Sequence, residues 1–332
     1  MAANRRNGVA RGVSPALAAV GGLAALAGLN RFIDMQAGAL PEQLPADPQD
    51  YDSRFGRVVY YVAGAESAPP LLLVHGHNAA ASAYEFRKQF SRLAEQYRVY
   101  APDLLGYGRS DRPPLDYSAD VYIELIRDLL RDVVQAPAIV VASSLSGAHA
   151  IQVAADDPEW VTRLALIGPT GLSRQTGPSA AGAAVTAVLR SPILGEALFH
   201  ALASRAGISG FLRDRTYYDP EAVDDDLVAM NYQSAHQPGA RYAPAAFVGG
   251  SLGHDVHDAW PRIGQPVLLL WGADAEITPI SDAATFLALN PGAELEPIDA
   301  AGLVPHDEQP DAFAQALLSW LDRTQDLIPG PV

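Results

Sequence analysis

The chain has 332 residues, of which 49% are hydrophobic, so it is long enough for one large domain with an insertion, or for two domains, and it can bury a substantial core. Its formal net charge is −15, and because phosphate is repelled by an acidic protein, we expect no nucleic-acid partner. The absence of cysteine excludes disulfides, thiolate metal sites and a cysteine nucleophile.

The N-terminal segment, residues 1–39, differs in composition from the rest of the chain. An uncharged run over residues 12–30, mostly Ala and Gly with four leucines, follows three arginines and precedes Arg31. Its length is close to the roughly 20 residues that span a bilayer, which is typical of a membrane anchor or a signal segment; a surface helix or a leader is the alternative. We therefore expect a membrane-associated or exported protein, with a cytoplasmic location as the alternative.

Residues 40–52 (LPEQLPADPQDYD) are rich in Pro and acidic residues and are expected to form a linker. From residue 53 onward, short apolar runs alternate with amphipathic stretches. Runs that are apolar throughout are typical of strands buried on both faces of a parallel sheet. The expected strands are Arg57–Val62, Leu71–Val74, Arg98–Ala101, Ala138–Ala142, Leu164–Ile167, Val267–Trp271 and Ala293–Ile298.

Helical stretches lie between these runs. In Ala119–Val134, apolar residues recur every four positions, and Asp311–Leu321 is a similar closing helix. Strand–helix alternation predicts an α/β fold with right-handed crossovers. The interval 171–263 breaks the alternation and is expected to be a helical cap that shapes a substrate pocket, so the core spans 53–170 and 264–323, and 324–332 is a tail.

Residues 142–147 (ASSLSG) are expected to form a sharp turn from the strand Ala138–Ala142 into a helix. A nucleophile on such a turn needs small residues two positions before it and two after it, and only Ser144 meets this requirement in register. The positive end of the following helix would favour negative charge that develops at its hydroxyl. A tight turn that uses small residues without any catalytic role is the alternative.

A second turn follows the strand Leu71–Val74, in the sequence VHGHN. In an acyl-transfer site, such a turn directs a backbone N–H at the pocket. We expect that N–H to be the one of His77, and we expect it to form an oxyanion hole together with the N–H of Leu145.

Five motifs in order, VHGHN, APDLLGYGRSDRP, VASSLSG, PVLLLWGADAEITP and AGLVPHDEQPDAF, resemble the α/β-hydrolase superfamily of the helical-cap type over about residues 53–323. The resemblance implies an eight-stranded, mostly parallel sheet flanked by helices. It also implies a Ser–Asp–His triad in that chain order and hydrolysis of an ester, an amide or a related bond.

Two triad positions depart from this pattern. Ala275 stands where the family has its acid, and Leu303 stands where it has its base, although the residues around both are in register. A serine hydroxyl is a weak nucleophile unless a base accepts its proton, and loss of triad members costs about 10⁴- to 10⁶-fold in turnover. Asp274 and His306 are the nearest substitutes in sequence. Other histidines that could enter the pocket are His77, His149, His254 and His257.

Two functions stay open from the sequence alone. One is a serine hydrolase of a small or apolar ester-like substrate that uses Ser144 with a non-standard base. The other is a catalytically silent protein that binds a small apolar ligand in the same pocket; a membrane-tethered scaffold without a ligand is a third and weaker alternative. No cofactor is expected, because the sequence contains no phosphate-binding loop. No metal is expected either, because no His, Asp and Glu residues are spaced along the chain as metal ligands are, and His254–Asp258 is typical of a solvated helix end.

Overall fold

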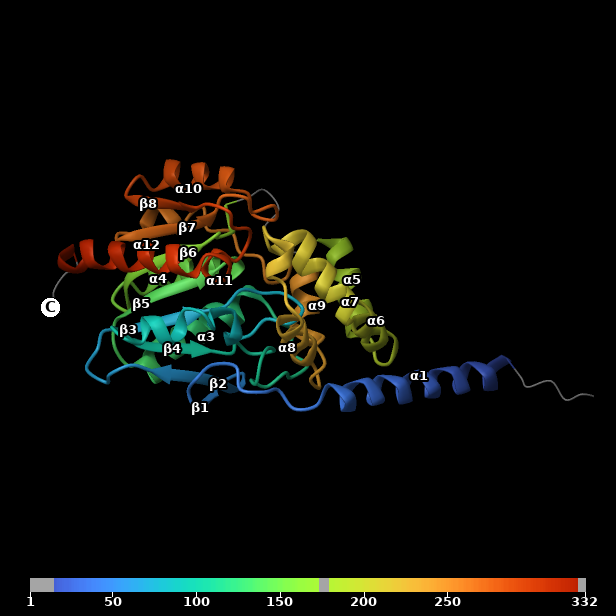
Figure 1. The fold of residues 1–332 in the computed structure, drawn as a ribbon. Helices are drawn as coiled ribbons and strands as arrows, with labels where there is room; N and C mark the ends of the chain where they lie inside the picture. Colours follow the sequence, from blue (N-terminus) through green and yellow to red (C-terminus); the bar gives the residue numbers. More distant parts are fainter. Residues whose placement is uncertain (1–14, 173–178, 328–332) are drawn as a thin grey trace, which may run out of the picture.

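The computed structural model describes residues 15–172 and 179–327. It contains one eight-stranded sheet in the order β1-β2-β4-β3-β5-β6-β7-β8 (Figure 1). β1 pairs antiparallel with β2 and β2 pairs antiparallel with β4, whereas all other pairs are parallel. The expected α/β-hydrolase architecture is therefore confirmed. The strands are β1 (Pro48–Ser53), β2 (Gly56–Ala63), β3 (Pro70–Val74), β4 (Arg98–Pro102), β5 (Ala138–Ser143), β6 (Val161–Ile167), β7 (Val267–Gly272) and β8 (Ala293–Ile298).

The central strands bury alternate side chains in two separate apolar layers, one on each face of the sheet. In β5, Val140 and Ala142 belong to one layer, and Ile139 and Val141 belong to the other. Because successive side chains of a strand point to opposite faces, a strand covered on both faces is apolar at every position. This explains the continuous apolar runs in the sequence.

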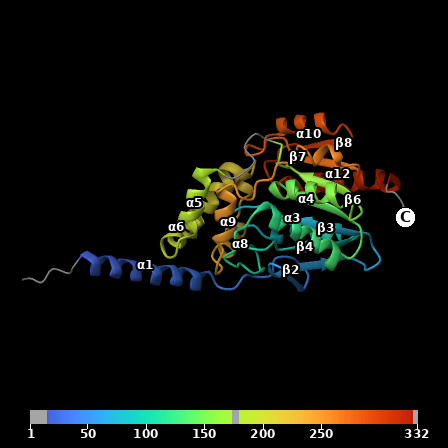
Figure 2. The same cartoon turned by 180° about the vertical axis from the view of Figure 1, so that it is seen from behind.

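Helices cover both faces of the sheet (Figures 1 and 2). The layer that contains Val140 is completed by helices α3, α4 and α10, and the opposite layer is completed by α2, α12 and a short 3₁₀ turn at Ala83–Phe86. The bounds of these helices, with the short α11, are α2 (Phe90–Leu93), α3 (Ala119–Asp128), α4 (Leu145–Asp156), α10 (Ala283–Leu289), α11 (Pro305–Glu308) and α12 (Pro310–Arg323).

Five helices between β6 and β7 form a cap at one end of the sheet (Figure 1). They have a small apolar core of their own, centred on Phe199, Tyr217 and Leu227. In the part of the chain that the structure describes, no strand lies between residues 168 and 266, as expected for a helical insertion. The cap helices are α5 (Ala180–Arg190), α6 (Leu194–Leu202), α7 (Arg205–Phe211), α8 (Asp225–Ala235) and α9 (Tyr242–Val248).

The N-terminal helix α1 (Pro15–Ala37) runs along the cap and away from the sheet (Figures 1 and 2). Residues 12–14 and the arginines that precede them lie outside the described residues. Among the helices that the structure describes, none by itself is long and apolar enough to cross a membrane. Together, α5 and α6 have the length and apolar composition of a membrane-crossing segment, but they are bent by 102° relative to each other.

Two segments differ from their sequence-based expectation. The expected linker 40–52 ends in β1, which was missed because its residues, PQDYDS, are polar and lie at an exposed sheet edge without apolar alternation. The expected helix Ala119–Val134 is α-helical only to Asp128 and continues as a π-helical turn over Leu129–Val134. That turn ends at Gln135, whose φ is +58°.

Candidate functional site

Ser144 occupies the turn between β5 and α4, as expected. Its φ of +52° and ψ of −121° lie outside the regions that a residue with a side chain ordinarily adopts, and such a conformation costs of order 1–3 kcal/mol. The Ser144 N–H donates to the carbonyl of Ile167 at 2.8 Å, and its carbonyl accepts from the N–H of Gly147 at 3.0 Å. A side chain at Gly147 would approach Pro169 to 3.0 Å, which explains the small residue at that position.

The serines on either side of Ser144 are buried and do more than leave room for the turn. The Ser146 hydroxyl donates to the carbonyl of His75 at 2.7 Å, so it joins α4 to the turn that follows β3. Ser143 packs against Gly76 in the same turn, where a Cβ would lie 3.4 Å from its hydroxyl oxygen. These contacts join segments about 70 residues apart, and no local sequence signal indicates them.

The turn after β3 is held rigidly by His75 and Glu85. His75 Nε2 accepts from the N–H of Leu104 at 2.9 Å, so Nδ1 carries the hydrogen that is donated to the Gly76 carbonyl at 2.7 Å. The Gly76 N–H donates to Glu85 Oε2 at 3.0 Å. The next N–H, that of His77, and the N–H of Leu145 at the start of α4 donate to no other described residue. The expected role of both groups in an oxyanion hole remains a prediction.

Ala275 and Leu303, the residues at the expected acid and base positions, bring no charge to this region. Ala275 is buried in the same apolar layer as Leu145 and Ala148 of α4. Leu303 is half-buried, and its N–H donates to the carbonyl of Thr216 in the cap at 2.8 Å. Neither side chain can accept a proton from a serine hydroxyl.

Asp274 and His306, the nearest substitutes in sequence, are not brought together. Asp274 is exposed. His306 is fully buried between Phe86 and Phe313, and its Nε2 lies 3.4 Å from Glu85 Oε1. Burial would raise the pKa of Glu85, but the neighbouring His306 imidazole holds that pKa below its ordinary value. His306 therefore supports the turn after β3 through Glu85.

The other candidate histidines are also engaged elsewhere. His77 and His149 pack together with Tyr122, and burial lowers the pKa of His149 to about 4 and that of His77 well below its ordinary value. His149 Nε2 lies 2.9 Å from the carbonyl of Leu252. The remaining two lie away from the turn: His254 Nε2 contacts Gln152, and His257 Nδ1 contacts Asp255. Within the described part of the chain, no side chain forms a hydrogen bond with the Ser144 hydroxyl.

A narrow cleft lies between the core and the cap, beside the turn after β3. Its accessible interior of about 60 Å³ is enough for roughly five water molecules. Arg87 and Asp307 form an ion pair of 2.7 Å in its wall, and the Tyr217 hydroxyl donates to the same carboxylate. Burial would raise the pKa of Asp307, but the positive charge of Arg87 holds it below its ordinary value. Ser144 does not line this cleft, whereas Asn78, which directly follows His77, does.

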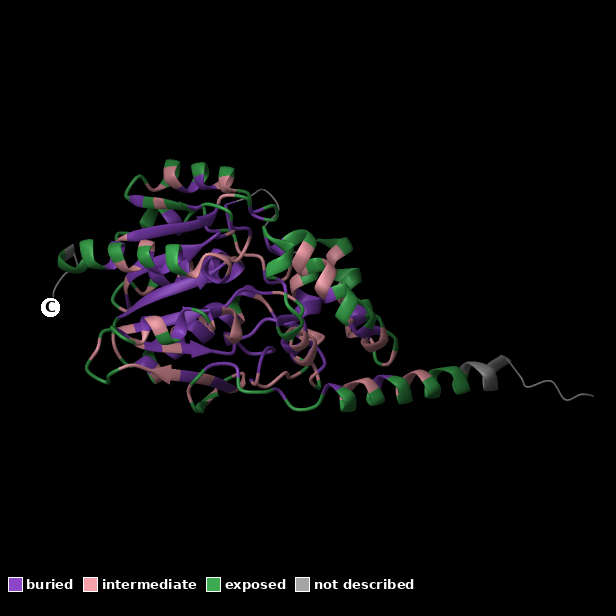
Figure 3. Cartoon of the chain, viewed as in Figure 1, coloured by how far each residue is buried: buried purple, intermediate pink, exposed green. Residues whose placement is uncertain are grey.

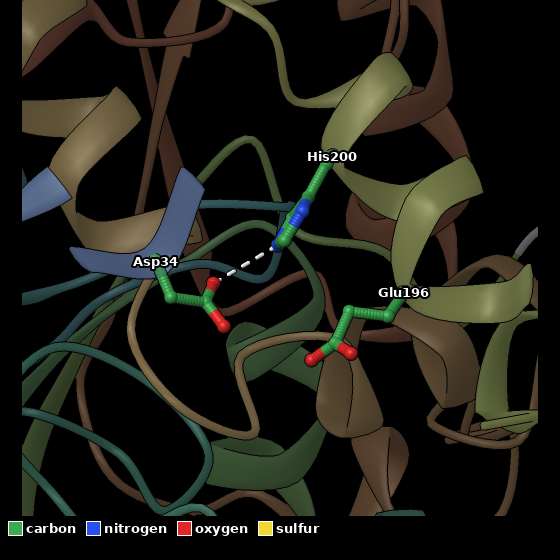
Figure 4. A group of neighbouring side chains, drawn as sticks. All are labelled: Asp34, Glu196 and His200. Atoms are coloured by element: carbon green, nitrogen blue, oxygen red, sulfur yellow. Dashed lines mark ion pairs between the residues drawn. The ribbon is translucent and has the colours of Figure 1, made fainter. Parts of the chain in front are cut away.

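One cluster of side chains has the composition of a metal site. Asp34 of α1 and Glu196 and His200 of α6 place one ligand atom each within 4.8 Å of one another (Figure 4). However, Arg241 lies 3.1 Å from Glu196, and His200 Nε2 lies 3.1 Å from Asp34. Because a guanidinium at this distance already neutralises the carboxylate and would repel a cation, we assign the cluster to ion pairs that fasten α1 to the cap.

The chain is similar in sequence and in fold to known hydrolases. The sequence profile described as "Alpha/beta hydrolase family" matches residues 71–316. The chain is 26% identical to the 2-hydroxy-6-oxo-6-(2'-aminophenyl)hexa-2,4-dienoic acid hydrolase of Metapseudomonas resinovorans, over 79% of this chain and 87% of that protein. It is 29% identical to the magnesium-chelatase 30 kDa subunit of Rhodobacter capsulatus, over 87% of this chain and 100% of that protein. The crystal structure of a serine hydrolase involved in carbazole degradation superposes with a TM-score of 0.69 at 24% identity, over 83% of this chain and 98% of that one.

Proposed function

This chain belongs to the alpha/beta hydrolase family, and we propose that it is a member that binds a small apolar ligand between core and cap while Ser144 lacks the partners of an efficient nucleophile. The observation that carries this proposal is the environment of Ser144, whose hydroxyl forms no hydrogen bond with another described side chain. Ala275 and Leu303 occupy the positions where an acid and a base would act. Without a base, residual catalysis comes from the oxyanion hole and from binding alone.

A similarity to one relative adds support for a binding role. The chain matches the magnesium-chelatase 30 kDa subunit along that protein's whole length, and the name of that relative describes a subunit of a larger enzyme. A hydrolase fold that works as an accessory protein keeps its pocket and needs no triad.

The second candidate function is a serine hydrolase of an ester-like substrate with a non-standard base. The strained backbone at Ser144, with φ at +52°, favours it, because a turn of this kind lifts the hydroxyl above the sheet for attack. The N–H groups of His77 and Leu145 would then stabilise the oxyanion. Asp274 and His306 are retained as the substitutes predicted for the acid and the base, although His306 contacts Glu85 instead of Asp274.

An esterase assay on an activated ester such as a p-nitrophenyl ester separates the two candidates. We expect the wild type and Ser144→Ala to turn over the ester at the same low rate, with Ser281→Ala, a matched change at an exposed serine, as the control. Mass spectrometry after treatment with a fluorophosphonate should show no adduct on Ser144. Rapid turnover that is lost in Ser144→Ala but kept in Ser281→Ala would establish the hydrolase.

We also propose that the apolar run over residues 12–30 attaches the protein to a membrane surface without crossing the membrane. The arginines on both sides of the run, which anionic headgroups attract, support attachment at the interface. Fractionation of cells that contain the full chain tests this: we expect the protein with the membranes, and intact protein found wholly in the soluble fraction would contradict it.

A further inference from the structure

Exposed apolar side chains are concentrated on the N-terminal helix and the cap. Of the 15 large apolar side chains that are exposed in the described part of the chain, 12 lie on α1, α5, α6, α7 and α9. On α6, Leu194, Leu198 and Leu202 recur every four residues and are 58%, 42% and 61% exposed, so they form one stripe along the helix. Apolar stripes of this kind usually mark a contact surface.

The helices that carry these side chains form one continuous surface. α1 contacts α6, α6 contacts α5, and α5 contacts α9. Asp34 pairs with His200 across the first of these contacts (Figure 4). Asn30 of α1 also donates to the Ile193 carbonyl, just before α6, at 2.9 Å. We call the exposed faces of α1, α5 and α6 the apolar platform; Figure 3 shows how far these helices are exposed at the end of the molecule opposite the sheet.

The N-terminal part of α1 extends beyond the cap in both views (Figures 1 and 2). Between Pro15 and Leu29 it contains no charged residue, and the described side chains Val20 and Leu23 are 65% and 43% exposed. A helix without a polar face is stable when a second apolar phase surrounds or contacts it. This part of α1 therefore needs a partner that the described part of the chain does not supply.

The charge distribution indicates which partner this is. Residues 1–39 contain four arginines and one aspartate, a net charge of +3, and residues 171–216 contain five arginines, one aspartate and one glutamate, also +3. Since the whole chain carries −15, the remaining residues carry −21. The helices of the apolar platform carry no net charge themselves, but in the sequence they are flanked by arginines of an otherwise acidic protein: Arg5, Arg6 and Arg11 before α1, and Arg205, Arg213 and Arg215 after α6. Anionic lipid headgroups attract such segments, whereas a second copy of this chain would present the same positive charge.

We propose that the apolar platform lies in the interface of an anionic bilayer, with α5 and α6 of the cap immersed beside α1. This inference extends the proposed attachment through residues 12–30, because it assigns half of the contact to the cap. The bend of 102° between α5 and α6 suits two helices that lie in the headgroup region at an angle to each other. The exposed face of α5 and α6 would then face the lipid surface.

Flotation of the full chain with lipid vesicles tests the platform. We expect the protein to bind phosphatidylcholine vesicles that contain phosphatidylglycerol, and to bind vesicles of phosphatidylcholine alone more weakly. High salt should weaken the binding to the anionic vesicles. Leu198→Glu with Leu202→Glu on α6 should weaken binding at least about tenfold, because two apolar side chains leave the contact. Ile277→Glu with Leu289→Glu, at exposed positions outside the cap and α1, is the matched control and should bind as the wild type does.

Other outcomes overturn the proposal in distinguishable ways. If Val20→Glu with Leu23→Glu on α1 abolishes binding while the α6 variant binds normally, residues 12–30 alone attach the protein and the cap takes no part. If the wild type binds no vesicles but forms a dimer that the α6 variant dissociates, a second copy covers the platform. Circular dichroism confirms that each variant is folded. Ser144 lies outside the apolar platform, so Ser144→Ala should bind vesicles as the wild type does. Vesicle binding therefore tests the platform independently of the function proposed for the site at Ser144.

Discussion

Ser144 is the residue of the candidate site with the most strained backbone, with φ at +52°. The conformation of Ser144 persists because the surrounding contacts determine it: Ile167 holds its N–H, and Ser146 fastens the start of α4 to His75. Glu85, half-buried behind the turn after β3, accepts from the Gly76 N–H and lies next to His306. The turn at Ser144 and the turn after β3 are therefore joined into one network of hydrogen bonds.

We predict that Ala275→Asp combined with Leu303→His will raise the turnover of an activated ester above that of the wild type. The new imidazole would accept the proton of Ser144, and the new carboxylate would hold the imidazole in the useful tautomer. The gain should be at most about 10⁴-fold, because the surrounding residues do not support the new groups. Steady-state kinetics with a p-nitrophenyl ester measures it.

Two controls accompany this double variant. Each single change should give less than the pair, since triad members act as a unit, and adding Ser144→Ala should remove the gain. If the folded double variant gains nothing, Ala275 and Leu303 do not stand at the triad positions.

At the scale of elements, α1 is fastened to the cap by a few polar contacts. Asn30 is 2% exposed and donates to the carbonyl of Ile193 and to Glu196, which also pairs with Arg241. We predict that Asn30→Ala weakens the docking of α1 by about 1 kcal/mol, the usual net value of a buried hydrogen bond. Hydrogen exchange of amides in the C-terminal half of α1 should then be roughly fivefold faster.

The matched control for this prediction is Arg31→Ala, at the next position but exposed, which should leave exchange unchanged. A chelator should also have no effect, because Arg241 neutralises Glu196 without a metal ion. Faster exchange of α1 amides on addition of a chelator would contradict our assignment of the Figure 4 cluster to ion pairs.

At the scale of the whole molecule, we predict that stability falls as the pH is lowered from about 7. The pKa of His149 is about 4 in the folded protein and 6.5 ordinarily, so between these values the unfolded chain binds the additional proton. That difference lowers the free energy of unfolding by about 2 kcal/mol between about pH 7 and about pH 5. Burial shifts the pKa of His77 in the same direction.

Urea denaturation at several pH values measures this dependence. His149→Gln should flatten the dependence between about pH 7 and about pH 5, whatever its effect on stability at pH 7. His257→Gln, at a half-exposed histidine, should keep the wild-type dependence. Below about pH 4.5, Glu85 and Asp307 lower the free energy of unfolding further. Their pKa values are lowered in the folded protein, so their stabilising charge disappears when they are protonated. Equal slopes in the wild type and His149→Gln would show that His149 is not buried in its neutral form.

Elements whose physical cause is local can be predicted from the amino-acid sequence. β7 was expected at Val267–Trp271 and is found at Val267–Gly272, because a strand buried on both faces must be apolar throughout. The turn at Ser144 was equally predictable, since only small residues permit it. β1 could not be predicted from the sequence, because antiparallel pairing with β2 at an exposed sheet edge imposes no apolar pattern on its residues, PQDYDS.

Which side chains meet depends on how the chain folds, because those contacts join residues far apart in the sequence. Nothing local to Glu85 or His306 indicates that they pair across 221 positions, and so His306 could be named from the sequence only as a substitute base. The docking of α1 on α6 through Asp34 and His200 is likewise a product of the fold. Composition revealed an apolar N-terminal run, but the packing of helices left the stripe on α6 exposed beside it and so extended the apolar platform to the cap.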